Sequence, residues 1–142
     1  MLVDVSSKLH EAAVIELLEY AVYSDPDALG QIIEQYAGEN QVLYAFEDQG
    51  EYVALIGAIT DQDKIEIKHL VVRPEDRLKG YGRGTIVELL LKERPTLLQA
   101  IADETTVDFF RNLGFQIIDD VGHNSGLELF KCLYHVDDEE EE

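Results

Sequence analysis

The segment from Lys64 to Glu93 constrains the fold more than any other part of the chain. It begins with a strand pattern, "KIEIKHLVV", and continues through the loop "RPEDRLKGYGRG". It then enters a helix that starts near Gly82 and must end before Pro95. The apolar strand "TLLQAIA" follows. Strand–helix–strand units cross over with a right-handed sense, so the two strands are expected to pair in parallel.

Hairpins are predicted on both sides of this unit. Strands are expected at 42–46 and 52–59, joined by "EDQG", and at "FQIID" and "LELFKCLY", joined around "DDVGHNSG". A strand in "MLVDVSS" opens the chain and a helix capped by Ser7 follows. A second helix begins at Pro26 with Asp25 as its cap, and a short one over "ETTVDFFRNLG" ends at Gly114. The predicted fold class is therefore α/β in the α+β sense, a mixed, mostly antiparallel sheet of about seven strands with about four helices.

Length and charge indicate the extent of the domain and exclude some classes of binding partner. A chain of 142 residues suits one domain, expected over residues 1–136, and the acidic run from 137 to 142 is expected to be a disordered tail. The net charge of −19 argues against a nucleic-acid partner, because phosphate contacts need basic surface. The chain has no apolar run of membrane-spanning length and no signal-peptide pattern, so a cytoplasmic protein without membrane contact is expected. The histidines lack metal-ligand spacing, so no metal is expected.

The strand "KIEIKHLVV" contains an irregularity. Ile65 and Ile67 alternate as apolar positions, and Leu70 and Val72 continue the alternation with its phase shifted by one residue. A β-bulge produces such a shift and leaves backbone groups unpaired. The alternative is that one face of the strand changes from core to surface. With a bulge, the backbone N–H of Leu70 or Val71 becomes available to a ligand.

The loop after this strand has the composition of an anion site. Its glycines let a ligand approach the backbone closely, and the helix that follows presents free N–H groups and a partial positive charge. Residues 64–83 hold six of the eleven lysines and arginines in this acidic chain. The arrangement suits a pyrophosphate, although it matches neither a Rossmann loop nor a P-loop. The cations expected there are Arg73, Arg77, Lys79 and Arg83.

One stretch of this loop, "RLKGYG" from Arg77 to Gly82, fits the signature R/Q-x-x-G-x-G/A. The chain thereby resembles the GCN5-related N-acetyltransferases, the GNAT superfamily. "HLVVRPEDR" and "DFFRNLGF" resemble two further parts of the family pattern, and the resemblance covers about residues 1–134. It implies that acetyl-CoA is the acyl donor and that the central parallel strands splay around its pantetheine. The residues it assigns to acetyl-CoA are Leu70, Val71, Val72, Arg77, Leu78, Lys79, Gly80, Tyr81, Gly82, Arg83, Gly84, Thr85, Asp103 and Phe110.

Acetyl transfer from a thioester to an amine needs a base, a donor for the developing oxyanion and a proton for the leaving thiolate. The resemblance places catalytic glutamates on the strand "KIEIKHLVV", so Glu66 is the candidate base and His69 is its rival. The alternatives are structural: Glu66 as a surface residue paired with Lys64 or Lys68, and His69 as a partly buried strand residue. The oxyanion donor is expected to be a backbone N–H freed by the bulge.

Two positions depart from the family pattern. Phe110 stands where many members have a tyrosine as general acid, and Asp103 stands where several have an asparagine that contacts pantetheine. Because phenylalanine cannot give a proton, Tyr134, Tyr44 or water remain as proton sources for the thiolate. The sequence does not choose among them.

The sequence therefore predicts an acetyl-CoA-dependent N-acetyltransferase that acts on a primary amine of a small molecule or peptide. Residues 1–63 carry thirteen acids and one basic residue, and the family fold implies that the first two helices and the final hairpin, with Asp119 and Asp120, frame the acceptor. A cationic acceptor is expected for this reason, with solubility as the alternative explanation of the acidity. Two other functions stay open: a GNAT-fold module that binds acyl-CoA for regulation with weak or no catalysis, which Phe110 favours, and an acidic interaction protein that acts through its tail. A homodimer is left open as well.

Overall fold

The computed structural model describes residues 1–22, 26–124 and 126–136. These residues form a seven-stranded sheet with the strand order β1-β2-β3-β4-β5-β7-β6. β4 and β5 pair in parallel, and the other neighbouring strands pair antiparallel. The mixed sheet predicted from the sequence is confirmed. The strands are β1 (Leu2–Asp4), β2 (Gln41–Asp48), β3 (Glu51–Asp61), β4 (Lys64–Val72), β5 (Leu97–Asp103), β6 (Gln116–Asn124) and β7 (Leu127–His135).

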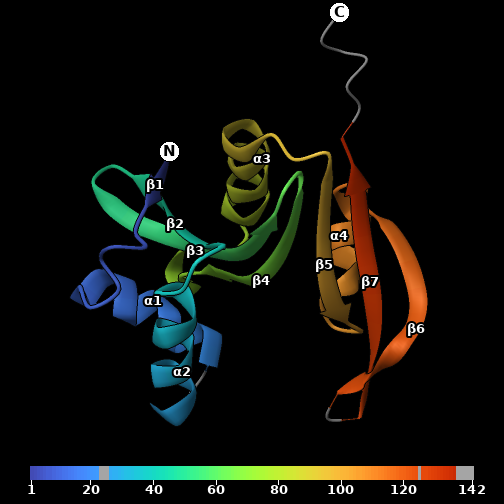
Figure 1. The fold of residues 1–142 in the computed structure, drawn as a ribbon, viewed down its shortest axis with the longest axis horizontal. Helices are drawn as coiled ribbons and strands as arrows, with labels where there is room; N and C mark the ends of the chain where they lie inside the picture. Colours follow the sequence, from blue (N-terminus) through green and yellow to red (C-terminus); the bar gives the residue numbers. More distant parts are fainter. Residues whose placement is uncertain (23–25, 125, 137–142) are drawn as a thin grey trace, which may run out of the picture.

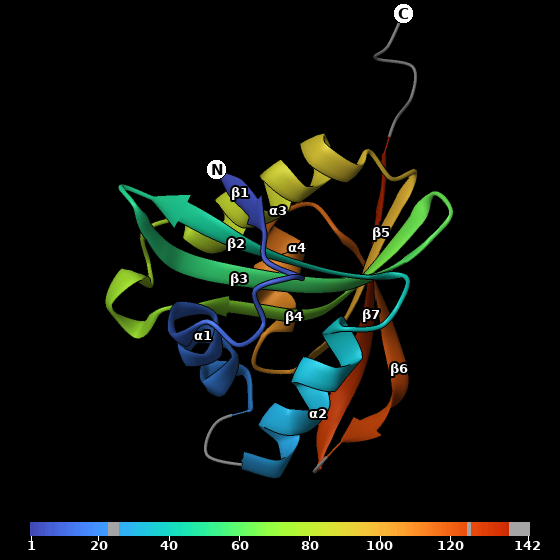
Figure 2. The same ribbon diagram turned by 60° about the vertical axis from the view of Figure 1, so that its left-hand side comes forward.

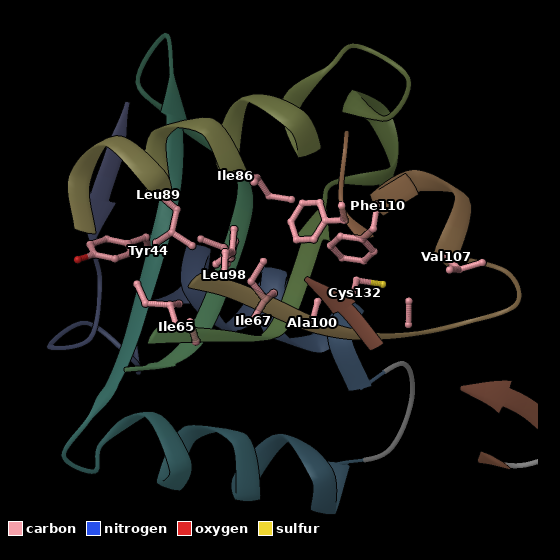
Figure 3. Close-up of a cluster of buried hydrophobic side chains, with 14 of the residues drawn as sticks. Tyr44, Ile65, Ile67, Ile86, Leu89, Leu98, Ala100, Val107, Phe110 and Cys132 are labelled. Atoms are coloured by element: carbon pink, nitrogen blue, oxygen red, sulfur yellow. The ribbon is translucent and has the colours of Figure 1, made fainter. Parts of the chain in front are cut away.

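Helices cover both faces of the sheet, as Figures 1 and 2 show. One face carries α1 and α2, whose buried side chains form a cluster around Leu17 and Tyr36. The other face carries α3 and α4, which pack through Ile86, Leu89 and Phe110 (Figure 3). Within the described residues the α-helices are α1 (Ala12–Val22), α2 (Pro26–Tyr36), α3 (Tyr81–Glu93) and α4 (Val107–Asn112), with a 3-10 turn at Pro74–Asp76.

The two parallel strands pair over only part of their length. Their register runs from Lys64 opposite Leu97 to Ile67 opposite Ala100, whereas β4 continues to Val72. The last three residues of β5 pair with β7 on the far side. In Figure 1 the ribbons of β4 and β5 diverge beyond the paired region. The central parallel pair is therefore splayed, as the family resemblance implies.

A β-bulge lies where the parallel pairing ends. The register between β3 and β4 shifts at Gly57, which faces His69, and the next pair on β4 involves Ile67. Lys68 is therefore the extra residue of the bulge. Leu70 packs against the same core cluster as Ile67 although two residues lie between them, a spacing that would place them on opposite faces of a regular strand. The bulge predicted from the phase shift is confirmed.

Two element boundaries differ from the prediction. Ser7 is not the N-cap of the first helix, because α1 begins at Ala12 and the N–H groups of Lys8 and Glu11 are bonded within turns that precede it. β6 extends to Asn124, so most of "DDVGHNSG" belongs to a strand rather than to a loop. The register between β6 and β7 shifts within that stretch, and this irregularity lets the polar sequence continue the strand.

Some expectations fall outside what the structure describes: the cap at Asp25, the side chains of Asp119 and Asp120, and the tail at 137–142. Within the described ranges, no helix has the length and apolar character needed to cross a membrane. The same part of the chain contains no cluster of three or more His, Cys, Asp or Glu side chains suited to holding a metal ion.

Candidate active site

A cleft of about 1080 Å³ lies where β4 and β5 diverge. Its walls come from the second half of β4, the loop after it, the first turn of α3, the end of β5 and α4, with Tyr20 and Ala21 of α1 at one side. Glu66, Lys79, Gly84 and Thr85 are not among the lining residues. The predicted site residues that line the cleft are His69, Leu70, Val71, Val72, Arg77, Leu78, Gly80, Tyr81, Gly82, Arg83, Asp103 and Phe110.

The backbone of β4 directs N–H donors toward the cleft, and that of Leu70 is one of them. The N–H of Arg73 donates to the carbonyl oxygen of Val53 across the β3–β4 pair, at 2.9 Å. Successive residues of a strand turn their N–H groups to opposite edges. The N–H of Val71 therefore also faces β3, and that of Leu70 faces the gap toward β5. Of the two donors expected from the sequence, Leu70 is the one directed at the cleft.

The first turn of α3 supplies a second set of donors. Gly80 is its N-cap, with a left-handed φ of 86° that glycine adopts without steric cost. Bonding within the helix begins with the N–H of Gly84, which donates to the carbonyl oxygen of Gly80 at 3.0 Å. The N–H groups of Tyr81, Gly82 and Arg83 precede that bond, and these residues line the cleft. A helix start of this kind favours an anion.

Gly82 lies at a close approach between elements. A Cβ atom at this position would lie 3.2 Å from Cζ of Phe109 and 3.9 Å from Cγ2 of Val72. Phe109 belongs to α4 and Val72 ends β4, so the start of α3 meets two other elements at this point. A side chain here would fill the space through which a ligand reaches the backbone.

The four cations expected in the loop divide into two pairs. Arg77 and Arg83 line the cleft. Nε of Arg77 donates to the carbonyl oxygen of Val72 at the end of β4 at 3.0 Å, which ties its side chain to this strand end. Arg73 and Lys79 are instead bound to Asp76, with N···O distances of 2.6 and 3.3 Å. The positive charge available to a ligand therefore comes chiefly from Arg77, Arg83 and the helix start.

Asp76 organises this loop from a buried position, being 7% exposed. Burial pushes its pKa up, but the hydrogen bonds from Arg73 and Lys79 outweigh burial and hold the pKa below its ordinary value. A lowered pKa in the folded state means that the carboxylate stabilises the fold at neutral pH and that this stabilisation disappears as the pH falls through that pKa.

We expect Asp76→Asn to lower the melting temperature at pH 7. The difference in melting temperature between variant and parent should disappear below about pH 4, because the Asp76 carboxylate of the parent becomes protonated there and loses its charge. Thermal unfolding followed between pH 2.5 and 7 measures the gap. Glu75→Gln is the matched control, because Glu75 is exposed and 3.9 Å from Arg73. A gap for Asp76→Asn that stayed constant with pH would contradict the role given to its charge.

The sequence profile of the family described as "Acetyltransferase (GNAT) domain" matches residues 8–132. The chain belongs to this GNAT family. No curated protein matches it in sequence.

Solved structures share the GNAT fold at low identity. An aminoglycoside 6'-N-acetyltransferase complexed with coenzyme A has a TM-score of 0.75 at 14% identity, over 95% of this chain and 96% of that one. A ribosomal-protein-alanine N-acetyltransferase from Brucella melitensis has a TM-score of 0.70 at 18% identity, over 96% and 99%. A GNAT acetyltransferase from Elizabethkingia anophelis with acetyl-CoA bound has a TM-score of 0.68 at 16% identity, over 96% and 97%.

The two positions that depart from the GNAT pattern, Phe110 and Asp103, are both held by contacts with neighbouring side chains or backbone. Phe110 is 7% exposed and stacks edge to face on Phe109 and Phe115, with ring centroids 5.2 Å away in both cases. Asp103 accepts hydrogen bonds at one carboxylate oxygen from the backbone N–H and hydroxyl of Thr105 and from those of Thr106. The Thr105 hydroxyl contributes most to holding the pKa of Asp103 below its ordinary value. Asp103 thus stabilises the turn into α4 at the cleft wall.

The remaining loop positions differ in how they meet the cleft. Leu78 has a φ of 65° and a fully exposed side chain. That backbone region favours glycine. The hydroxyl of Thr85 donates to the carbonyl oxygen of Tyr81 at 2.6 Å, inside the helix and away from the cleft. A Cβ atom on Gly84 would face Phe46 of β2 at 3.7 Å.

The two candidate bases lie on either side of the bulge. Glu66 forms an ion pair with Lys68 at 3.5 Å, and both side chains are partly exposed. His69 lines the cleft, and its Nδ1 lies 2.6 Å from the hydroxyl of Tyr36. Burial first, and the nearby charge of Lys68 second, lower the pKa of His69. The imidazole is therefore neutral at pH 7.

The two tyrosines considered as proton donors lie elsewhere. Tyr44 is buried at the opposite end of the core cluster from Phe110 (Figure 3), and its hydroxyl donates to Glu93. Burial first, and the bond to Glu93 second, raise its pKa. Tyr134 packs on Phe115 with ring centroids 5.5 Å apart and is not among the cleft residues.

Sequence reasoning missed several residues at or next to the cleft, among them Tyr36, Gly57 and Phe109. One of them had a readable signal, because an isolated glycine inside the apolar run "YVALIGAIT" indicates a close approach of another group to the strand. In the sequence, Tyr36 stands out only as one of the apolar positions of the second helix. The contact of Phe109 with the start of α3 joins elements distant in sequence and has no local pattern.

Proposed function

We propose that this GNAT chain is an acetyl-CoA-dependent N-acetyltransferase acting on a primary amine. The observation that carries the proposal is a single cleft with the donors of the α3 start in one wall and the Leu70 N–H in another. The proposal is supported by the family match and by related folds whose structures contain coenzyme A or acetyl-CoA. The cleft is large enough for a long, narrow ligand, and a Cβ atom at Gly82 would fill part of it.

In this proposal each residue has a stated role. The N–H groups of Tyr81, Gly82 and Arg83, with the guanidinium of Arg77, hold the pyrophosphate. The thioester lies in the gap between β4 and β5, where the Leu70 N–H donates to its carbonyl oxygen as negative charge develops. One such donor contributes about 2.7–4 kcal/mol to lowering the barrier. Acetyl-CoA supplies an activated acyl group, and the chain supplies position and charge stabilisation.

The acceptor amine must lose a proton before or during attack. An alkylamine has a pKa of about 10.4, so a base speeds the reaction at neutral pH. Glu66 is the carboxylate nearest in sequence to the bulge, and its partner Lys68 lines the cleft. We therefore assign the base to Glu66, acting directly or through water. Water supplies the proton to the leaving thiolate, because Phe110 has none to give.

A thiol-release assay with acetyl-CoA and a panel of primary amines tests the proposal. We expect acetylated amine and free coenzyme A in equal amounts, with mass spectrometry identifying the product. Absence of turnover with every amine, together with undetectable acetyl-CoA binding in calorimetry, would overturn the proposal.

A second candidate function follows from the surroundings of Phe110. Its ring is locked between two other phenylalanines, so the usual general acid is replaced by a packed apolar group. A GNAT module that binds acyl-CoA for regulation, with weak or no catalysis, fits this feature. Tight acetyl-CoA binding without turnover in the same assay would select this function.

We expect cationic amines to be better acceptors than neutral ones. Residues 1–63, which supply α1, α2 and the first strands, carry thirteen acids and one basic residue, and α1 borders the cleft. Negative walls raise the local concentration of a cation, and salt screens the effect. At low ionic strength we expect kcat/KM for a diamine, which carries two positive charges at pH 7, to exceed by about tenfold that for a hydroxy-amine of equal length, whose second end is neutral. Equal values without salt dependence would contradict the prediction.

A further inference from the structure

The contact between Tyr36 and His69 links the buried layer under α2 to the cleft. The hydroxyl of Tyr36 lies 2.6 Å from Nδ1 of His69, and the two rings meet edge to face with centroids 5.6 Å apart. Tyr36 is the last residue of α2 and is 1% exposed. His69 follows the bulge of β4 and lines the cleft. Since Nδ1 is occupied by Tyr36, Nε2 is the ring nitrogen left to the cleft.

Gly57 makes room for this contact. It lies on β3 directly opposite His69 in the sheet register. A Cβ atom on Gly57 would lie 2.1 Å from the Tyr36 hydroxyl oxygen and 2.3 Å from its Cζ. Only glycine permits the phenol to rest on the strand and reach the imidazole. Three elements, α2, β3 and β4, thus converge on one hydrogen bond.

The length and surroundings of this bond favour the Tyr36 hydroxyl as its donor. A distance of 2.6 Å fits a hydroxyl donor better than a ring N–H donor, whose bonds are usually about 2.9–3.0 Å long. A buried tyrosine hydroxyl needs an acceptor. In the described part of the chain, that hydroxyl has Nδ1 of His69 as its one hydrogen-bond partner. Burial raises the pKa of Tyr36, so the phenol keeps its proton.

We propose that Tyr36 is a positioning residue that holds His69 in its Nε2–H tautomer, so that the cleft receives a hydrogen-bond donor there and not a base. This inference rests on the proposed acetyl transfer. The Nε2–H is a second donor to the thioester carbonyl oxygen, beside the N–H of Leu70, the next residue. A neutral imidazole held this way cannot take a proton at Nε2, so deprotonation of the amine is left to Glu66.

The groups around His69 are consistent with a neutral donor. Lys68 is the adjacent charge on β4, and Glu66 is ion-paired to it. From α2 the packed group is Tyr36, from β3 it is Gly57, and from α1 the uncharged Tyr20 lines the same cleft. A protonated His69 would lie beside the Lys68 ammonium in a partly buried position.

The tautomer is measured by nitrogen-15 NMR of histidine-labelled protein, which requires no turnover. We expect the neutral ring of His69 to carry its proton on Nε2. Tyr36→Phe removes a bond made only to the neutral ring, so the pKa of His69 should rise by about 0.5 to 1 unit. Tyr52→Phe is the control, because Tyr52 packs against the same buried cluster and is not among the cleft residues. A proton found on Nδ1, or a fall in the pKa with Tyr36→Phe, would overturn the proposal.

Enzyme kinetics of His69 variants give an independent test of the proposal. Gln can place an amide N–H near the position of Nε2, whereas Leu cannot donate. We expect His69→Leu to lower kcat by about 10²–10³-fold, and His69→Gln to retain a clearly larger share. Equal losses of kcat in the two variants, together with loss of the acidic limb of the pH profile of kcat/KM, would show that His69 acts as a base. That result would overturn the proposal. If the parent has no turnover at all, the proposed function fails, and the NMR result still decides the tautomer.

Discussion

Gly57→Ala is expected to destabilise the protein by about 3 kcal/mol, which for a domain of this size lowers the melting temperature by about 10 °C. The added methyl group would lie 2.1 Å from the Tyr36 hydroxyl oxygen and 2.8 Å from Cε1 of the same ring. Tyr36 is among the largest fully buried side chains of the protein. The ring must leave its site or β3 must move, and β3 is a central strand paired on both sides.

Two further variants separate this steric effect from a general effect of replacing glycine. Gly30→Ala lies within α2 with no atom near the new methyl group, so it should stabilise the protein by about 0.5–1 kcal/mol. In a Tyr36→Ala background the clash partner is absent, and Gly57→Ala should then cost much less. Chemical denaturation measures all of these free energies of unfolding. An equal cost of Gly57→Ala in both backgrounds would show that Tyr36 does not rest on this strand.

Local patterns predicted the framework of the site well. The alternation of apolar residues in "KIEIKHLVV" indicated the bulge, because a phase shift in a two-residue period requires an extra residue, and that residue is Lys68. The strand–loop–helix order around residues 64–93 predicted the parallel pair and the helix start that faces the cleft. These features are fixed by neighbours in the chain, so the sequence alone shows them.

Such local patterns could not predict contacts between elements that are distant in the sequence. Arg73 and Lys79 were expected to serve a ligand, but the 3-10 turn after β4 brings Asp76 under both of them. Charge counting along the chain cannot tell a cation that faces a cleft from one that is neutralised by a buried carboxylate. Tyr36 and His69 are 33 residues apart, and their bond depends on how α2 crosses β3 and β4. Which ring nitrogen of His69 carries the proton therefore could not be predicted from the residue type alone.

Gly82→Val is expected to weaken acetyl-CoA binding by about 100-fold or more. The pyrophosphate in our proposal is held by N–H groups of the first turn of α3, and a branched side chain at Gly82 would stand between them and the ligand. Losing two hydrogen bonds to a charged group costs about 3 kcal/mol or more, which corresponds to that change in affinity. The new Cβ atom would also meet Cζ and Cε1 of Phe109 at 3.2 and 3.3 Å, pushing the aromatic wall of the cleft outward.

Backbone strain does not account for the expected loss, because Gly82 is not among the glycines with positive φ. Gly84→Ala, two residues further along α3, is the matched control. Its Cβ atom would make an ordinary 3.7 Å contact with Phe46, and its N–H is already bonded to the carbonyl oxygen of Gly80. We expect that variant to bind acetyl-CoA as the parent does. Calorimetric titration with acetyl-CoA measures the affinities, and the unliganded melting temperatures show whether each variant is folded. Parent-like affinity in folded Gly82→Val would place the pyrophosphate elsewhere, whereas a loss confined to Gly82→Val would locate it at the start of α3.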